Sequence, residues 1–242
     1  MEIITSLENS KVKEWTKLAQ RKYRDEANLF VIEGDHLITE ALKNGLIKEI
    51  ISANIELEFN ITTHYVTTAI MKKISSQESP SEVIAICHKM EPSTIGNKVI
   101  ALDAIQDPGN LGAIIRSAVA FNFDTIILGE NTVDLYNPKT IRATEGMLFN
   151  ISIIKKDLIT TIDDLKKLNC KVFGTSLENG DDIANIEVND KMIIVIGNEG
   201  QGINKDILAK CDQNIYIPIN KSCESLNASI AASIIMYEIN KR

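Results

Sequence analysis

Short apolar runs alternate with stretches of helical spacing along the whole chain. In the first 90 residues the runs predict strands at 28–33, 48–52, 64–66 and 82–88. The stretches with helical spacing predict helices at 11–21, 35–44 and 68–74. Asn9 or Ser10 can cap the first helix, and Gly45 ends the second. The pattern therefore predicts a small α/β unit over residues 1–90.

The alternation stops at residues 91–97, where Pro, Ser, Thr and Gly gather, and this segment is typical of a linker. It then resumes, so residues 98–242 form a second expected unit. Strands are predicted at 99–104, 125–128, 149–154, 172–175, 192–196 and 215–217, and helices at 111–122, 138–144, 158–168 and from 226 onward. Alternating strands and helices predict a mostly parallel sheet with helices on both faces.

Composition narrows the class of protein. The chain has 242 residues and a net charge of −7, with no apolar run long enough to span a membrane. The first residues lack the basic-then-apolar pattern of a signal peptide, so a cytoplasmic location is expected. The four cysteines are far apart and fit neither a zinc cluster nor a disulfide scaffold, and no metal is expected.

The charge is unevenly distributed. Residues 1–24 contain six lysines and arginines against three glutamates, a local excess of +3. A basic first helix can follow a phosphate backbone. Charge alone equally fits an ordinary solvated helix face.

A glycine-rich loop follows the most apolar strand. Residues 197–202 read GNEGQG, which is neither the GxGxxG of dinucleotide-binding folds nor a P-loop. Glu199 within the loop would repel a pyrophosphate. A cofactor without phosphate, such as S-adenosylmethionine, fits better. The three histidines all precede residue 98, so serine–histidine chemistry and histidine metal sites have little support in the second unit.

Two polar residues stand near the start of the predicted helix 111–122. Asn110 can cap that helix or serve a site. Arg116 lies in an otherwise apolar stretch, so its guanidinium either extends to solvent or points into a site. Its five fork-shaped donors suit phosphate.

Three segments of the second unit are QDPGNLGAIIRSA, VIGNEGQGI and IPINKSCESLNASIAAS. In order and spacing they resemble the motifs of the SpoU (TrmH-like) RNA ribose 2′-O-methyltransferases of the SPOUT superfamily. The resemblance covers residues 98–242. Residues 1–90, with SLENSKVKEW and RKYRDEANLFVIEG, resemble more loosely the RNA-binding domain of ribosomal RNA members, which is similar to ribosomal proteins. The resemblance implies a trefoil-knotted, Rossmann-like C-terminal domain and a homodimer. It also implies that the final helix lies at the dimer interface and that each active site is completed across that interface.

The resemblance also implies roles for individual residues. Arg116 would be the catalytic arginine, while Asn110, Glu199, Ser225 and Asn227 order it, the ribose and the cofactor. S-adenosylmethionine would be bound by Thr175, Ser176, Leu177, Gly197, Asn198, Gly200, Gly202, Ile217, Ile219, Ser225, Leu226 and Asn227. RNA contacts are expected from Lys11, Lys17, Arg21, Lys22, Arg24 and Arg142.

One position departs from the family pattern. Glu145 stands where the family usually has a small or apolar residue, and its carboxylate could pair with Arg142 or another cation.

The implied reaction is methylation of a ribose 2′-hydroxyl, and 23S ribosomal RNA is the expected substrate. Two alternatives stay open. One is a transfer RNA ribose 2′-O-methyltransferase, against which the separate N-terminal unit argues. The other is a non-catalytic RNA-binding assembly factor, against which the intact set of expected catalytic residues argues.

Overall fold

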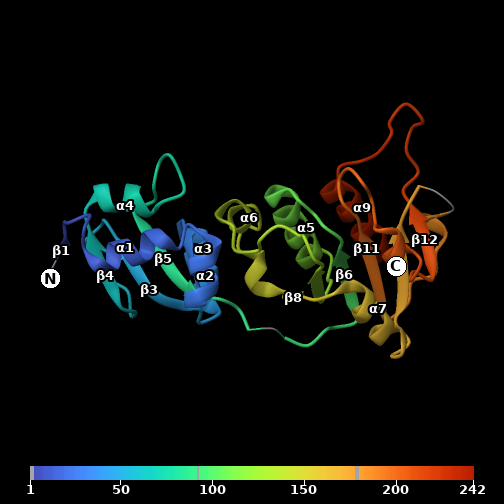
Figure 1. The fold of residues 1–242 in the computed structure, drawn as a ribbon, viewed down its shortest axis with the longest axis horizontal. Helices are drawn as coiled ribbons and strands as arrows, with labels where there is room; N and C mark the ends of the chain where they lie inside the picture. The colour runs from blue at the N-terminus through green and yellow to red at the C-terminus, as the bar shows by residue number, and fades with distance from the viewer. Residues whose placement is uncertain (1–2, 92, 178–179) are drawn as a thin grey trace. The chain divides into compact units, whose positions relative to one another are not determined.

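A computed structural model describes residues 3–91, 93–177 and 180–242 (Figure 1). The chain divides into two compact units, residues 1–91 with 136–149, and residues 92–135 with 150–242. Residues 136–149 therefore pack with the first unit, whereas the sequence pattern places them within the second. Residues 91 and 93–97 of the expected linker are free of helix and strand, and residue 92 lies outside the described residues.

The first unit is built on a mixed five-stranded sheet in the order β1-β4-β3-β5-β2. β5 is antiparallel to both its neighbours, while β1, β4 and β3 run parallel. The strands are β1 (Ile3–Ile4), β2 (Leu29–Glu33), β3 (Ile47–Ser52), β4 (Thr63–Val66) and β5 (Val83–His88). The helices are α1 (Ser10–Lys17), α2 (Arg21–Ala27), α3 (Asp35–Lys43), α4 (Thr68–Ile74) and α6 (Pro138–Ala143).

Helices α1 and α4 pack together on one face of this sheet. Val12 and Trp15 of α1 and Ile70 and Met71 of α4 belong to one buried cluster, which also contains Ile84 and Ile86 of β5. Figure 1 shows the two helices as neighbours. Because successive side chains of a strand face opposite sides, Ala85 and Cys87 line the other face.

The expected helix 11–21 is shorter in the structure, and a separate helix follows it. Asn9 caps α1 through its side chain, and α1 ends at Lys17. A second helix, α2, then begins at Arg21 and ends before Asn28, whose left-handed backbone (φ 54°) turns the chain into β2. The sequence pattern missed α2 because RKYRDEA has no apolar stripe.

Segment 136–149 packs against β2 through aromatic side chains. The ring centroid of Phe30 lies 4.6 Å from that of Tyr136 and 6.4 Å from that of Phe149. Tyr136 also accepts a hydrogen bond from the Met90 backbone N–H at 3.0 Å. These contacts explain why a segment distant in sequence belongs to the first unit.

A buried tryptophan depends on one carboxylate in this unit. The Trp15 indole N–H donates to Glu49 Oε1 at 2.9 Å, and Trp15 is only 2% exposed. Burial raises the pKa of the Glu49 carboxyl, but Trp15, Lys11 and His64 outweigh burial and hold that pKa below its ordinary value of 4.5.

Replacing Glu49 with alanine is therefore expected to destabilise the protein by about 1–3 kcal/mol, because the buried indole N–H loses its acceptor. Because the pKa of Glu49 is lower in the folded state, its carboxylate stabilises the fold at pH values above the unfolded-state pKa. This stabilisation is lost as the pH falls through the folded-state pKa. The difference between wild type and Glu49→Ala, measured by urea unfolding, should thus be largest at neutral pH and shrink below about pH 4.5. Glu14→Ala, an exposed α1 change, is the control, and an equal effect of both would contradict the prediction.

The second unit is a seven-stranded sheet in the order β10-β12-β9-β11-β6-β7-β8, in which every pairing is parallel. Its strands are β6 (Lys98–Leu102), β7 (Thr125–Leu128), β8 (Ser152–Lys155), β9 (Lys171–Thr175), β10 (Asp181–Asp182), β11 (Met192–Ile196) and β12 (Gln213–Tyr216). Its helices are α5 (Pro108–Ala120), α7 (Leu158–Lys166), α8 (Lys205–Leu208) and α9 (Ala228–Asn240). The predicted parallel sheet is confirmed.

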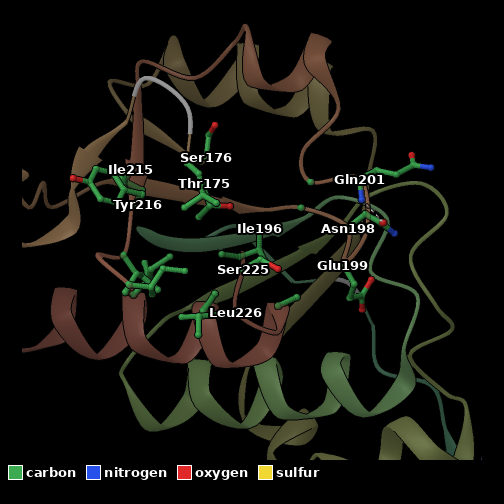
Figure 2. Close-up of a pocket in the computed structure, with 18 of the residues that line it drawn as sticks. Thr175, Ser176, Ile196, Asn198, Glu199, Gln201, Ile215, Tyr216, Ser225 and Leu226 are labelled. Carbon is green, nitrogen blue, oxygen red and sulfur yellow. Dashed lines mark hydrogen bonds between the residues drawn. The ribbon is translucent and has the colours of Figure 1, made fainter. Parts of the chain in front are cut away.

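Helices cover both faces of this sheet. Val99, Ile193 and Val195 share a buried cluster with Leu158 of α7 and Ile207 of α8. The alternate residues of the same strands face the opposite side, where α5 and α9 run next to each other. Figure 2 shows this helix pair beneath the strands. Within the described residues, no helix is long and apolar enough to cross a membrane.

Candidate functional site

A cavity of about 400 Å³ opens at the carboxyl ends of β9, β11 and β12. Parallel sheets commonly bind ligands at this edge. Five segments line the cavity: the end of β9, the loop after β11, the end of β12, the loop between β12 and α9, and the start of α9. Figure 2 shows Thr175, Ile196 and Ser225 around the same space. The lining residues from 175 to 217 are Thr175, Ser176, Leu177, Ile196, Gly197, Asn198, Glu199, Gly200, Gln201, Gly202, Ile215, Tyr216 and Ile217.

The loop after β11 is closed by its own hydrogen bonds. Asn198 and Gly202 pair through their backbones at 3.0 and 2.9 Å. The Asn198 side chain accepts from the N–H groups of Gly200 and Gln201 and donates to Ala104 O at 2.8 Å. A side chain on Gly197 would overlap this loop, because its Cβ would lie 2.3 Å from the carbonyl carbon of Gly202.

Ala104 has a strained backbone beside this loop. Its φ of 55° lies in the left-handed region, which costs a non-glycine residue roughly 1–2 kcal/mol. The Asn198 amide holds the Ala104 carbonyl, and the chain then turns so that Gln106 and Asp107 direct their N–H groups at Glu199. Strain of this kind gathers at functional sites.

Three of the five expected catalytic residues form a hydrogen-bonded chain. Asn110 Nδ2 donates to Glu199 Oε1 at 2.8 Å, and Asn227 Nδ2 donates to Asn110 Oδ1 at 3.0 Å. Asn227 Oδ1 caps α9 by accepting from the N–H groups of Ser229 and Ile230. Ser225 lines the cavity nearby. The fold thus joins α5, the glycine loop and α9 through amide and carboxylate groups.

Asn110 does not cap α5. The helix begins three residues earlier than predicted, at Pro108, and Asp107 is its cap, accepting from the Asn110 N–H at 2.9 Å. The Asn110 side chain is therefore available for the contact with Glu199, which excludes the simpler of its two expected roles.

Glu199 is held as a carboxylate. Burial raises the pKa of Glu199, but hydrogen bonds outweigh that effect, and the pKa lies below its usual range. The donors are the Asn110 amide and nearby backbone N–H groups, including those of Gln106 and Asp107. A carboxylate that accepts three hydrogen bonds is better suited to orienting neighbouring groups than to accepting a proton.

Arg116 stands apart from this chain. It is the one charged residue of α5, it is exposed, and it is absent from the cavity lining. Within the described residues its guanidinium has no hydrogen bond or ion pair. A single copy of the second unit therefore does not bring Arg116 to the cavity.

The cavity suits a nucleoside-sized ligand with a flat apolar part. Ile196, Ile215 and Ile235 supply buried apolar wall, and the backbone of the glycine loop supplies polar groups. Every residue expected to bind the cofactor lines the cavity except Asn227, which caps α9 instead. No group of three metal-ligating side chains occurs in the described part of the chain.

Sequence reasoning missed several residues around the site. The backbone N–H groups of Gln106 and Asp107 carry no side-chain signal. Ala228, Ala231 and Ile235 line the cavity from one face of α9, and their helical spacing would have indicated it. The Ser229 hydroxyl, 2.7 Å from Asn227 Oδ1 and 3.2 Å from Asn110 Oδ1, was also missed.

The residues expected to contact RNA lie in the first unit and differ in availability. Lys11 and Lys17 are exposed on α1, and Arg21 and Lys22 form ion pairs with Asp25 and Glu26 along α2. Arg24 requires a correction. It is 4% exposed, and its guanidinium donates to the carbonyls of Leu18 and Ala19 at 2.8 Å, so it supports the α1–α2 turn and does not face solvent.

Arg142 and Glu145 are not paired with each other. Arg142 Nη1 donates to Ser76 Oγ at 2.8 Å. Glu145 is exposed with a left-handed backbone (φ 49°), and its carbonyl accepts from His36 Nε2 at 3.0 Å. The unusual residue at position 145 thus contributes through its backbone in this structure.

The fold and the cavity define an α/β domain with a ligand site at the carboxyl ends of parallel strands, joined to a smaller α/β unit. The sequence pattern of the SpoU rRNA Methylase family matches residues 97–237, and that of the MRM3-like substrate binding domain matches residues 9–85. The chain belongs to the SpoU rRNA methylase family.

Individual relatives agree with this assignment. The chain is 38% identical over 99% of both lengths to the 23S rRNA (guanosine(2553)-2′-O)-methyltransferase RlmP of Bacillus subtilis. An rRNA methyltransferase from Sinorhizobium meliloti has a similar structure, with a TM-score of 0.90, 29% identity, and coverage of 99% of this chain and 97% of that one. The AdoMet-bound form from the same organism gives a TM-score of 0.87 at 30% identity, with the same coverage.

Proposed function

We propose that this protein transfers a methyl group from S-adenosylmethionine to a ribose 2′-hydroxyl of 23S ribosomal RNA, and therefore acts in the cytoplasm. The target is the guanosine equivalent to that named for RlmP, since the two chains are similar over nearly their whole lengths. The observation that carries the proposal is the hydrogen-bonded chain from Asn227 through Asn110 to Glu199, which reaches a cavity of about 400 Å³.

The cofactor residues act mainly through position. The glycine loop and the apolar wall of Ile196, Ile215 and Ile235 would hold the nucleoside part, with Leu226 beside it. When bound, S-adenosylmethionine supplies a methyl group on a sulfonium, and the sulfur leaves as a neutral thioether when the methyl group is transferred. The residues of the site must align the ribose oxygen with that methyl group, and the ribose hydroxyl must lose one proton. Alignment alone can supply about 7–11 kcal/mol.

The polar chain fixes the rim of the site. Asn110 is oriented by donors from α9 on its oxygen and by the Glu199 carboxylate on its nitrogen. A target ribose meeting this rim would find groups that are already ordered. Pre-ordered dipoles stabilise charge without reorganising during the reaction.

Arg116 would complete the site from a second copy of the chain. The guanidinium is exposed and unpaired within the described residues, and it lies on α5, beside α9. Ile230, Ile234 and Tyr237 of α9 are 52%, 38% and 52% exposed, an apolar face suited to a homodimer. There Arg116 would hold the target phosphate and polarise the 2′-hydroxyl, whose proton leaves to a neighbouring base or to water.

The reaction is tested by transfer of labelled methyl groups from S-adenosylmethionine to unmodified 23S rRNA transcripts. We expect one alkali-resistant dinucleotide, placed at the proposed guanosine, because a 2′-O-methyl group blocks cleavage there. Label in transfer RNA alone would support the first alternative. Tight S-adenosylhomocysteine binding without transfer to ribosomal RNA, free or in assembling particles, would support the non-catalytic assembly factor.

A further inference from the structure

The fold gathers lysines that are far apart in sequence onto one face of the first unit. Helix α1 contributes Lys11, Lys13 and Lys17, and helix α4 contributes Lys72 and Lys73. The two helices pack together over the same side of the sheet through their apolar residues. Lys72 and Lys73 are both exposed, and α4 has no acidic residue.

Direct contacts join α4 to the segment that precedes α1. Lys73 Nζ donates to Leu7 O at 3.2 Å, just before α1, and Lys13 Nζ forms an ion pair with Glu8 at 2.7 Å. Both lysines lower the pKa of the Glu8 carboxyl, with Lys13 the larger cause. The lysines of α1 and α4 are therefore electrostatic neighbours, although about 60 residues separate them in sequence.

This face keeps a positive charge after its carboxylates are counted. Glu8 and Glu14 lie on it, and Glu49 approaches Lys11 at 3.6 Å. Five lysines against three carboxylates leave a formal charge of +2 in a chain whose net charge is −7. Lys17 and Lys72 form no ion pair within the described residues.

Helix α2 differs, although the sequence pattern groups it with α1. Arg21 and Lys22 each form an ion pair four residues along the helix, with Asp25 and Glu26. Arg24 is buried. On α1, Lys11 and Lys13 also have carboxylate partners, but Lys17 has none within the described residues, so the unpaired charge next to α4 is that of Lys17.

A hollow of about 490 Å³ adjoins the start of α1 and the strand β4. Its polar lining comes from side chains that can donate hydrogen bonds, namely Asn9, Ser10, Lys11, Thr63, His64 and Tyr65. No carboxylate lines it, although Glu49 lies 3.6 Å from Lys11 Nζ and 3.0 Å from His64 Nε2. At the other end of α1, the Tyr23 ring centroid lies 5.5 Å from Lys17 Nζ. Donor-rich hollows suit phosphate oxygens, and an aromatic ring beside a lysine suits an unpaired base.

We propose that the α1–α4 face, defined by Lys11, Lys13, Lys17, Lys72 and Lys73, is the surface on which the first unit binds the phosphate backbone of the substrate RNA. The inference rests on the proposed function, since ribosomal RNA is the polyanion it names. It adds Lys72 and Lys73 to the RNA contacts and removes α2 from the centre of that surface. The residues contact phosphates and carry no base specificity of their own.

The test compares two double variants that change the net charge equally. Lys72→Gln/Lys73→Gln removes two charges from the α1–α4 face. Lys43→Gln/Lys167→Gln is the control, because both lysines are exposed elsewhere and each pairs with a carboxylate three residues before it. Affinity for a 23S rRNA fragment containing the target guanosine is measured against salt, with S-adenosylhomocysteine present, and thermal melting checks the fold of each variant.

We expect the α4 variant to bind about tenfold more weakly at 0.1 M salt, with the slope of log affinity against log salt reduced by about 1.5, because each lost phosphate contact removes roughly 0.7–0.9. A slope equal to that of the control variant would overturn the proposal. Methyl transfer by the wild type is measured separately. Failure of the proposed reaction would abolish that transfer, whereas failure of the proposed RNA-binding face would appear only in the salt dependence.

Discussion

Replacing Arg116 with alanine is expected to lower the rate of methyl transfer by about 10³-fold while leaving the fold and cofactor binding unchanged. Arg116 is exposed and unpaired within the described residues, so its removal breaks no contact of the single chain. Losing a preorganised donor at a reacting oxygen typically costs about 10²–10³ in rate, and losing its phosphate contact adds to this.

The measurement is single-turnover methyl transfer with saturating RNA, alongside S-adenosylhomocysteine affinity by calorimetry. Arg116→Lys keeps the charge but not the planar fork of donors. If the lysine variant transfers methyl groups at the wild-type rate, a role that depends on the fork is wrong. If the alanine variant does so, Arg116 is not catalytic.

In the proposed homodimer, mixed dimers would show which active site Arg116 serves. A chain with Arg116→Ala keeps its cofactor pocket, and a chain with a blocked pocket keeps its arginine. If Arg116 acts on the partner's cofactor, mixing the two inactive variants restores one working site in each mixed dimer. Random pairing makes about half of the dimers mixed, so about a quarter of wild-type activity returns. If Arg116 acts within its own chain, none returns.

The sequence pattern predicted the second unit well, because buried parallel strands such as 192–196 are continuous apolar runs between glycine-rich turns. The family resemblance, and not the pattern, named residues that the structure places around the cavity, and their role in cofactor binding stays a prediction. It could not predict where α5 starts. Asp107 and Asn110 are both good capping residues, and only the fold decides that Asp107 caps while Asn110 reaches Glu199.

The sequence pattern was weaker in the first unit. Arg24 counts as a positive charge in any window of sequence, yet the turn between α1 and α2 buries it against two carbonyls. Lys72 and Lys73 lie far along the chain from the basic stretch 1–24, yet helix packing places them beside α1. Segment 136–149 packs with a unit that ends 45 residues earlier in the chain. Such pairings are tertiary, and no local pattern contains them. The trefoil knot is likewise a tertiary feature, and it stays a prediction of the family resemblance.

Replacing Gly197 with alanine is expected to weaken S-adenosylhomocysteine binding by at least about 100-fold, which corresponds to about 2.7 kcal/mol. The added Cβ would lie 2.3 Å from Gly202 C and Ile203 N, and 2.7 Å from Gly202 O. These are backbone atoms of the loop that lines the cavity, so they cannot rotate away as a side chain would. The loop must open, and the pairing of Asn198 with Gly202 is lost.

Gly200 provides a matched control three residues along the same loop. An alanine Cβ there would have Asn198 Oδ1 as its nearest neighbour at 3.7 Å, an ordinary contact, and the backbone of Gly200 is not left-handed. Gly200→Ala should therefore keep the fold and the loop, and lose affinity only as far as its methyl group meets the ligand. Calorimetry with S-adenosylhomocysteine measures the affinity of both variants, and thermal melting separates a loop effect from unfolding.

Wild-type affinity in Gly197→Ala would show that the close approach of Gly197 to Gly202 does not shape the cofactor site. Equal losses in both variants would mean that ligand contact, and not loop closure, explains the need for glycine. A loss confined to Gly197→Ala would identify Gly197 as the residue that lets the strand end fold back into a cofactor loop.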